Sequence, residues 1–105
     1  MNAISVAELA KKRADGDDFM LLDVREPDEI ATAAIAGATL IPMAQVPDRL
    51  AELPTDKPIY VLCHVGGRSG RVTQFLNENG YANAANITGG IRAWSVEIDP
   101  SVPQY

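Results

Sequence analysis

Cysteine and histidine are the scarcest reactive residues in this chain of 105 residues, which holds one of each, Cys63 and His64. A single cysteine excludes an intrachain disulfide, so the small secreted folds that disulfides hold together are ruled out. One Cys and one His also fall short of the usual three or four ligands of a zinc site, so we expect no metal. No motif implies an organic cofactor.

Basic residues and long apolar runs are also in short supply. The chain has 9 Lys and Arg against 14 Asp and Glu, a net charge of −5, which disfavours nucleic acid as a partner. No apolar run approaches the roughly 18 residues of a membrane span, and the first residues do not resemble a signal peptide. We therefore expect a cytoplasmic protein without membrane contact. Since no long apolar stripe demands a partner, we also expect a monomer.

The length fits one domain, residues 1–105, whose thin core leaves little room for a large internal cavity. Strands are expected at 19–22, 39–41, 59–62 and 84–87, and helices at 5–13, 27–34, 47–53, 69–79 and 91–94, followed by an extended tail from residue 100. Because strands alternate with helices, the sequence predicts an α/β fold with a mostly parallel central sheet and helices on both faces.

The lone cysteine directly follows Ile59–Leu62, the clearest strand pattern in the chain. Ligands of parallel α/β sheets bind beyond the carboxyl ends of strands, which is where Cys63 lies. Gly66 and Gly67 allow the backbone to curl so that its N–H groups point inward at the start of the next helix. Such a loop binds small anions and favours the thiolate form of Cys63. The segment is also locally basic, with four basic and one acidic residue in 57–92.

Several alternatives compete at this loop. Cys63 could be an inert buried thiol, although the Gly-Gly-Arg-Ser continuation favours a reactive one. His64 as a general base is disfavoured, because side chains of adjacent residues often point apart. Cysteine phosphatases place an arginine six residues after the nucleophile, whereas Arg68 lies five and Arg71 eight residues after Cys63. That count disfavours a phosphatase or arsenate reductase and predicts a loop for a smaller group, such as one sulfur atom.

Three blocks of sequence carry a resemblance to a known family: Leu21–Pro27, Cys63–Ser69 and Thr88–Trp94. In this order and with this loop length, they resemble the rhodanese-like sulfurtransferases of the small single-domain type, over nearly the whole chain. One stretch departs from the family pattern Gly-His-Ile-Pro-Gly-Ala, because residues 33–38 read Ala-Ala-Ile-Ala-Gly-Ala. We expect the fold to survive this change and the turn before Ile35 to differ.

The resemblance implies a sulfurtransferase that moves a sulfane sulfur from a donor such as thiosulfate to cyanide or a thiol through a Cys63 persulfide. It implies that the loop holds the persulfide through His64, Val65, Gly66, Gly67, Arg68 and Ser69. Arg68, assisted by Arg71, would attract the anionic donor and stabilise sulfite.

Two questions stay open at this point. Asp23 and Arg25 either support the cysteine loop or form a structural ion pair, and we favour the ion pair. The domain could instead be a sulfur-relay or docking module that takes sulfur from a protein partner and has little activity with thiosulfate. The closing block is expected to be structural, with Trp94 in the core and Gly89-Gly90 in a turn.

Overall fold

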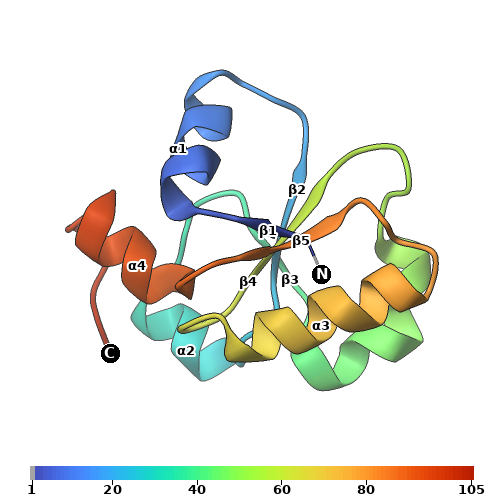
Figure 1. Cartoon of the computed structure of the whole chain (residues 1–105). Helices are drawn as coiled ribbons and strands as arrows, with labels where there is room; N and C mark the ends of the chain where they lie inside the picture. The colour runs from blue at the N-terminus through green and yellow to red at the C-terminus, as the bar shows by residue number, and fades with distance from the viewer. Residues whose placement is uncertain (1) are drawn as a thin grey trace.

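Five strands form one sheet in the order β1-β5-β4-β2-β3, and each neighbouring pair is parallel (Figure 1). The structure is a computed structural model that describes residues 2–105. The strands are β1 (Ala3–Ile4), β2 (Met20–Asp23), β3 (Thr39–Leu40), β4 (Ile59–Leu62) and β5 (Ala84–Ile87). The helices are α1 (Val6–Ala14), α2 (Pro27–Thr32), the 3₁₀ helix η1 (Met43–Glu52), α3 (Gly67–Glu78) and α4 (Gly90–Glu97).

Successive residues of β4 point to opposite faces of the sheet, and each face has its own helices. Ile59 and Val61 pack in the core beneath α3 and η1, whereas Tyr60 and Leu62 pack in the core beneath α1 and α4. Figure 1 shows the two groups of helices on opposite sides of the sheet. The predicted α/β fold with a parallel sheet and helices on both faces is confirmed.

Local sequence signals explain several of the elements. A capping box of Ser5 and Glu8 starts α1, because each side chain accepts a hydrogen bond from the other residue's backbone N–H, at 3.1 and 3.2 Å. Trp94 is buried in the core beneath α1 and α4, as expected. No helix within residues 2–105 has both the length and the apolar character needed to cross a bilayer.

Three helices differ from the predicted bounds for reasons of backbone geometry. The helix predicted at 47–53 falls in η1, which begins earlier, at Met43, and ends at Glu52; it is two short helices separated by a kink at Arg49, where the backbone is not helical. Helix α3 begins at Gly67 rather than residue 69, because Gly66 makes the turn into it with a φ of +107°. Helix α2 ends at Thr32, since Ala33 is extended.

The two ends of the chain also differ from the prediction. Strand β1 was not predicted, because two residues are too few to show a strand pattern. It is defined by its backbone hydrogen bonds with the β5 segment, such as Thr88 N–H to Ile4 O at 2.9 Å. The tail turns rather than continuing extended. Val102 N–H donates to Asp99 O at 3.1 Å, and the Val102 side chain is buried in the core.

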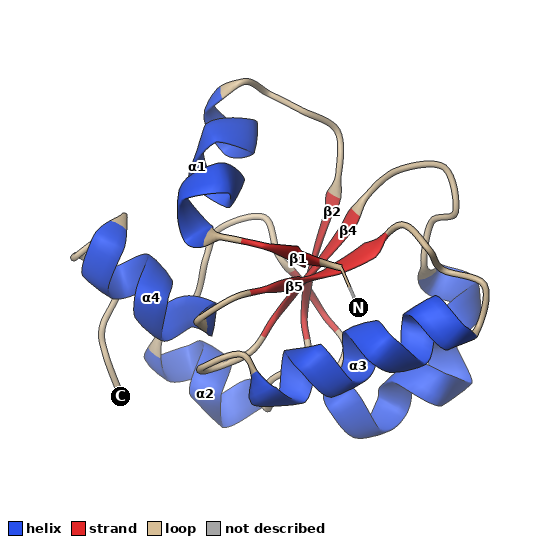
Figure 2. Ribbon diagram, in the orientation of Figure 1, coloured by secondary structure: helices blue, strands red, loops and turns tan. Residues whose placement is uncertain are grey.

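The carboxyl ends of β2, β4 and β5 lie at one edge of the sheet, where α2, α3 and α4 begin (Figure 2). Helix α4 starts directly against the residues that follow β4. Ile91 N–H donates to Cys63 O at 2.9 Å, and Arg92 N–H donates to His64 O at 3.1 Å. Gly90 makes this approach possible, since a Cβ at its position would lie 2.5 Å from Cys63 O and would also overlap His64 O.

We expect Gly90→Ala to lower the free energy of unfolding by more than about 3 kcal/mol, measured by urea denaturation. The methyl group would overlap two carbonyl oxygens, in addition to roughly 1–2 kcal/mol of left-handed backbone strain at a φ of +61°. Gly16→Ala is the matched control, because Gly16 has a φ of +71° but nothing within 4 Å of an added Cβ. Equal losses in the two variants would contradict the importance of this close approach.

Candidate active site

Cys63 lies immediately after β4, and its side chain continues the row that faces α3. It packs in the same core as Val61 and Val72, and only 1% of its surface is exposed. Because β4 is parallel to β2 and β5, the thiol lies at the edge of the sheet where these two strands also end.

The loop between β4 and α3 supplies hydrogen-bond donors to the Cys63 sulfur. Gly66 N–H donates to Cys63 Sγ at 3.1 Å, and the Ser69 hydroxyl lies 3.2 Å from the same atom. Helix α3 starts at Gly67, so the sulfur lies at the positive end of the helix. All three features direct the positive ends of dipoles at the sulfur.

Asn86 is a member of this cluster that the sequence reading missed. Ser69 Oγ is hydrogen-bonded to Asn86 Oδ1, and Asn86 Nδ2 donates to Gly66 O at 3.3 Å. The Ser69 hydroxyl carries one proton and faces two acceptors, the Asn86 amide and the Cys63 sulfur. The available signal was a polar residue within the fully buried strand Ala84–Ile87.

Arg68 points at a carboxylate of α2 rather than standing free in the loop. Its guanidinium donates to both carboxylate oxygens of Glu29, at 2.6 and 2.8 Å. This bidentate pairing lowers the pKa of Glu29 to about 2 and raises the pKa of Arg68. The predicted role of Arg68 was to attract an anion, but in this arrangement its charge is balanced by Glu29.

The side chain of Tyr105 lies over the loop and connects several of its charged neighbours. Its ring stacks on the His64 imidazole with centroids 4.0 Å apart and an angle of 12°. Its hydroxyl donates to Glu29 Oε2 at 2.7 Å and accepts from Arg25 Nη1 at 3.0 Å. Burial raises the pKa of the Tyr105 hydroxyl. Neither Glu29 nor Tyr105 was identified from the sequence.

His64 takes part in this stack and makes no hydrogen bond to the Cys63 sulfur in the described part of the chain. Its Nε2 atom is buried without a hydrogen-bond partner among residues 2–105. This geometry gives no support to His64 as a base for the thiol, the role that the sequence already disfavoured.

Asp23 and Arg25 form a fully buried ion pair, with Arg25 Nη2 at 2.7 Å from Asp23 Oδ2. Arg25 also donates to Ala33 O at 2.9 Å and, through its backbone N–H, to Asp23 Oδ1 at 3.1 Å. The pair and these bonds therefore hold together the turn after β2 and the start of the segment after α2. It reaches the loop indirectly, because Arg25 also bonds Tyr105.

The altered stretch at residues 33–38 is accommodated in the same region. Ala33 and Ile35 are buried in the core, and Ala36 O accepts a hydrogen bond from Arg13 Nη1 at 3.1 Å. The chain thus closes this turn without the histidine and proline of the family pattern.

A pocket of about 420 Å³ opens at the loop and is lined by Cys63, His64, Val65, Gly67, Arg68 and Arg71. The structure therefore brings the predicted loop residues together around the thiol, with Gly66 and Ser69 in contact with the sulfur and with Asp23 and Arg25 buried behind. Arg71 is exposed and, within residues 2–105, forms no ion pair, so it is the cation left to meet an anionic ligand. No group of three potential metal ligands occurs among the described residues.

The fold and the loop together define an α/β domain that presents a cysteine thiol in a glycine-containing turn between a strand and a helix. The profile of the Rhodanese-like domain matches residues 5–97. The chain therefore belongs to the rhodanese-like domain family.

Individual relatives agree with this assignment. A sulfurtransferase of Allochromatium vinosum is 37% identical over 95 residues, covering 90% of this chain and 89% of that protein. The chloroplastic Rhodanese-like/PpiC domain-containing protein 12 of Arabidopsis thaliana is 43% identical, and the match covers 97% of this chain but 36% of the plant protein. The crystal structure of a rhodanese-like domain protein from Staphylococcus aureus has a TM-score of 0.86 at 33% identity and covers 100% of this chain and 99% of that one.

The Glu29–Arg68 pair predicts a specific loss of stability in acid. The pKa of Glu29 falls from its ordinary value of 4.5 to about 2 in the folded protein. The stabilisation that the Glu29 carboxylate gives to the fold is therefore complete above about pH 4.5 and disappears as the pH falls toward 2. We expect the difference in free energy of unfolding between the native chain and Glu29→Gln to be largest near neutral pH and to shrink over this interval.

Urea denaturation at a series of pH values measures this difference. Glu52→Gln is the matched control, because Glu52 pairs with Arg49 on the exposed surface, where ion pairs contribute little. Parallel pH profiles for the native chain and Glu29→Gln would contradict a stabilising role for the pair.

Proposed function

We propose that this domain transfers a sulfane sulfur from a small anionic donor, such as thiosulfate, to a thiophilic acceptor through a persulfide on Cys63. Membership of the rhodanese-like family and the sulfurtransferase among its relatives support sulfur transfer as the general chemistry. Thiosulfate as donor and cyanide or a thiol as acceptor are the specific form that we propose.

The observation that carries the proposal is the environment of the Cys63 sulfur. One backbone N–H and one hydroxyl are directed at the sulfur at the start of α3, and the sulfur also borders an open pocket of about 420 Å³. A persulfide carries its negative charge on the outer sulfur, which would lie in that pocket beside the loop and Arg71.

The reaction has two covalent steps. The Cys63 thiolate attacks the outer sulfur of thiosulfate; a sulfur–sulfur bond to Cys63 forms, the bond to the sulfonate sulfur breaks, and sulfite leaves with the electron pair. The acceptor, cyanide or a thiolate, then attacks the outer sulfur of the persulfide and restores the Cys63 thiolate. No external oxidant or reductant is needed, and Arg71 is placed to attract the anionic donor.

A sulfur-relay module is the second candidate, and the exposure of Val65 favours it. This apolar residue lines the pocket and is 55% exposed, so it is available for contact with a protein that donates or accepts sulfur. A domain of this kind would form its persulfide from a partner protein and react poorly with thiosulfate.

We expect intact mass spectrometry to show a gain of one sulfur atom when the reduced protein is treated with thiosulfate. Cyanide should reverse the gain, and Cys63→Ser should show none while keeping the native melting transition. A gain that persists in Cys63→Ser would remove Cys63 from the reaction. No gain with thiosulfate, but a gain from a protein-bound persulfide, would select the relay function.

We expect Ser69→Ala to slow persulfide formation by roughly 5-fold, because about 1 kcal/mol of hydrogen bonding to the sulfur is lost. A quenched time course with thiosulfate, in which alkylation traps the remaining free thiol, measures the rate of persulfide formation. Ser95→Ala is the matched control, since Ser95 is also a buried helical serine but bonds Val102 O in the opposite core. Equal rates in the two variants would show that the Ser69 proton stays with Asn86.

A further inference from the structure

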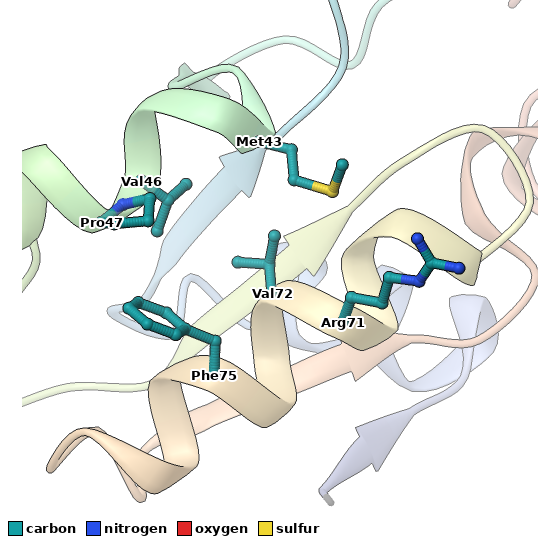
Figure 3. Close-up of a pocket in the computed structure, with 6 residues that line it drawn as sticks. All are labelled: Met43, Val46, Pro47, Arg71, Val72 and Phe75. Carbon is teal, nitrogen blue, oxygen red and sulfur yellow. The ribbon is translucent and has the colours of Figure 1, made fainter.

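A second cavity of about 150 Å³ lies beside the thiol pocket and is lined by Met43, Val46, Pro47, Arg71, Val72 and Phe75 (Figure 3). We propose that it binds the apolar arm of an organic sulfur donor that carries one negative charge, while the reactive sulfur of that donor meets Cys63. This inference rests on the proposed function and names the substrate class of the same site.

The two cavities are joined by one residue, Arg71, which lines both. Arg71 lies near the start of α3, and Phe75 follows one helical turn later, about 5.4 Å along the axis. Figure 3 shows the side chains of η1 facing Val72 and Phe75 of α3, with Arg71 toward the beginning of that helix. A ligand held by Arg71 can therefore extend along α3 into the apolar cavity.

The charges of the pocket favour a donor with a single negative charge. Glu29 engages both ends of the Arg68 guanidinium and balances it, which leaves Arg71 as the pocket cation without an ion-pair partner in residues 2–105. Thiosulfate carries two negative charges and has no apolar part. An organic thiosulfonate, R–SO₂–S⁻, or an organic persulfide, R–S–S⁻, carries one charge and an apolar arm.

The size and lining of the cavity set the size of the arm. A cavity of about 150 Å³ lined by aliphatic and aromatic side chains holds a benzene molecule. Val46 and Val72 are buried and Phe75 is half-buried, so an apolar arm placed against them would bury apolar surface that otherwise contacts water. A phenyl or branched aliphatic group therefore fits, whereas a methyl group leaves the cavity unfilled.

The chemistry is the same as with thiosulfate. The Cys63 thiolate attacks the terminal sulfur of R–SO₂–S⁻, the new sulfur–sulfur bond forms, and the old one breaks with its electron pair on the sulfinate, R–SO₂⁻. The charge is balanced, and Arg71 is placed to stabilise the leaving sulfinate while the arm stays in the cavity.

The test compares benzenethiosulfonate with methanethiosulfonate, which share the reacting atoms and the charge but differ in the arm. With cyanide as the common acceptor, we expect kcat/KM for the phenyl donor to exceed that for the methyl donor by roughly 10-fold or more, after correction for their relative reactivity with a free thiol in solution. Phe75→Ala and Met43→Ala should each move this ratio toward 1, and Arg71→Met should lower kcat/KM for both donors.

Phe19→Ala is the matched control, because Phe19 is also half-buried but packs in the opposite core, and its ratio should equal that of the native chain. Melting curves identify variants that fail to fold, and Met43→Ala at the half-buried rim serves where Phe75→Ala does not fold. A corrected ratio near 1 in the native chain overturns the subsite, as does a ratio that Phe75→Ala and Met43→Ala leave unchanged. This is also the result expected if the groove receives a protein partner instead.

Direct binding separates this inference from the proposed function. Benzenesulfinate has the charge and the ring but no sulfur to transfer, so its binding, measured by calorimetry, reports the subsite alone. If no donor loads Cys63 but benzenesulfinate binds more tightly than methanesulfinate and depends on Arg71 and Phe75, the subsite stands and sulfur transfer falls. If donors load Cys63 but the two sulfinates bind alike, the subsite falls and sulfur transfer stands.

Discussion

The position of the cysteine loop depends on the contact between the first turn of α4 and the peptide units that follow β4. The backbone amides of Ile91 and Arg92 bind the carbonyls of Cys63 and His64, and they reach them because Gly90 has no side chain. These bonds hold the start of the loop in which the Gly66 N–H donates to the sulfur. The cysteine turn therefore depends on two loops, one at the end of β4 and one at the end of β5.

A chain of charged and polar side chains spans the same edge of the sheet and sets the electrostatics of the pocket. It runs from the buried Asp23–Arg25 pair through the Tyr105 hydroxyl to Glu29 and Arg68. Every charge within it has a partner, which suits groups removed from water. Because Glu29 balances Arg68, a ligand meets a smaller net positive charge in the pocket than Arg68 and Arg71 together would give.

The parts of the fold that depend on local pattern were predictable from the sequence. Strands β2, β4 and β5 and the capped helix α1 rest on apolar runs and on one capping motif, and they lie where the patterns placed them to within a residue or two. The cysteine turn was predictable for the same reason, because a strand, two glycines and a helix stand next to each other in the chain. Strand β1 was missed because its two residues pair only after β5 is in place.

The partners of the loop were not predictable, since they come from distant segments. Glu29 lies 39 residues before Arg68, and Asn86 lies 17 residues after Ser69. Each contact depends on how side chains of separate elements are oriented, which no periodicity encodes. Glu29 looked like one acidic residue in the first turn of a helix, and its place opposite Arg68 required the packing of α2 beside α3.

The dependence of the cysteine turn on α4 limits how the site can be moved between proteins. Grafting residues 63–69 onto another parallel α/β scaffold would transfer the thiol, the glycines and the arginine, but not the amides that hold the two carbonyls in place. A functional transplant also needs a helix that follows the adjacent strand, begins at a glycine and donates its first backbone amides to those two carbonyls. The smallest part of the fold that can be transferred is therefore two strand–loop–helix units, and a designer should copy β4–α3 and β5–α4 together.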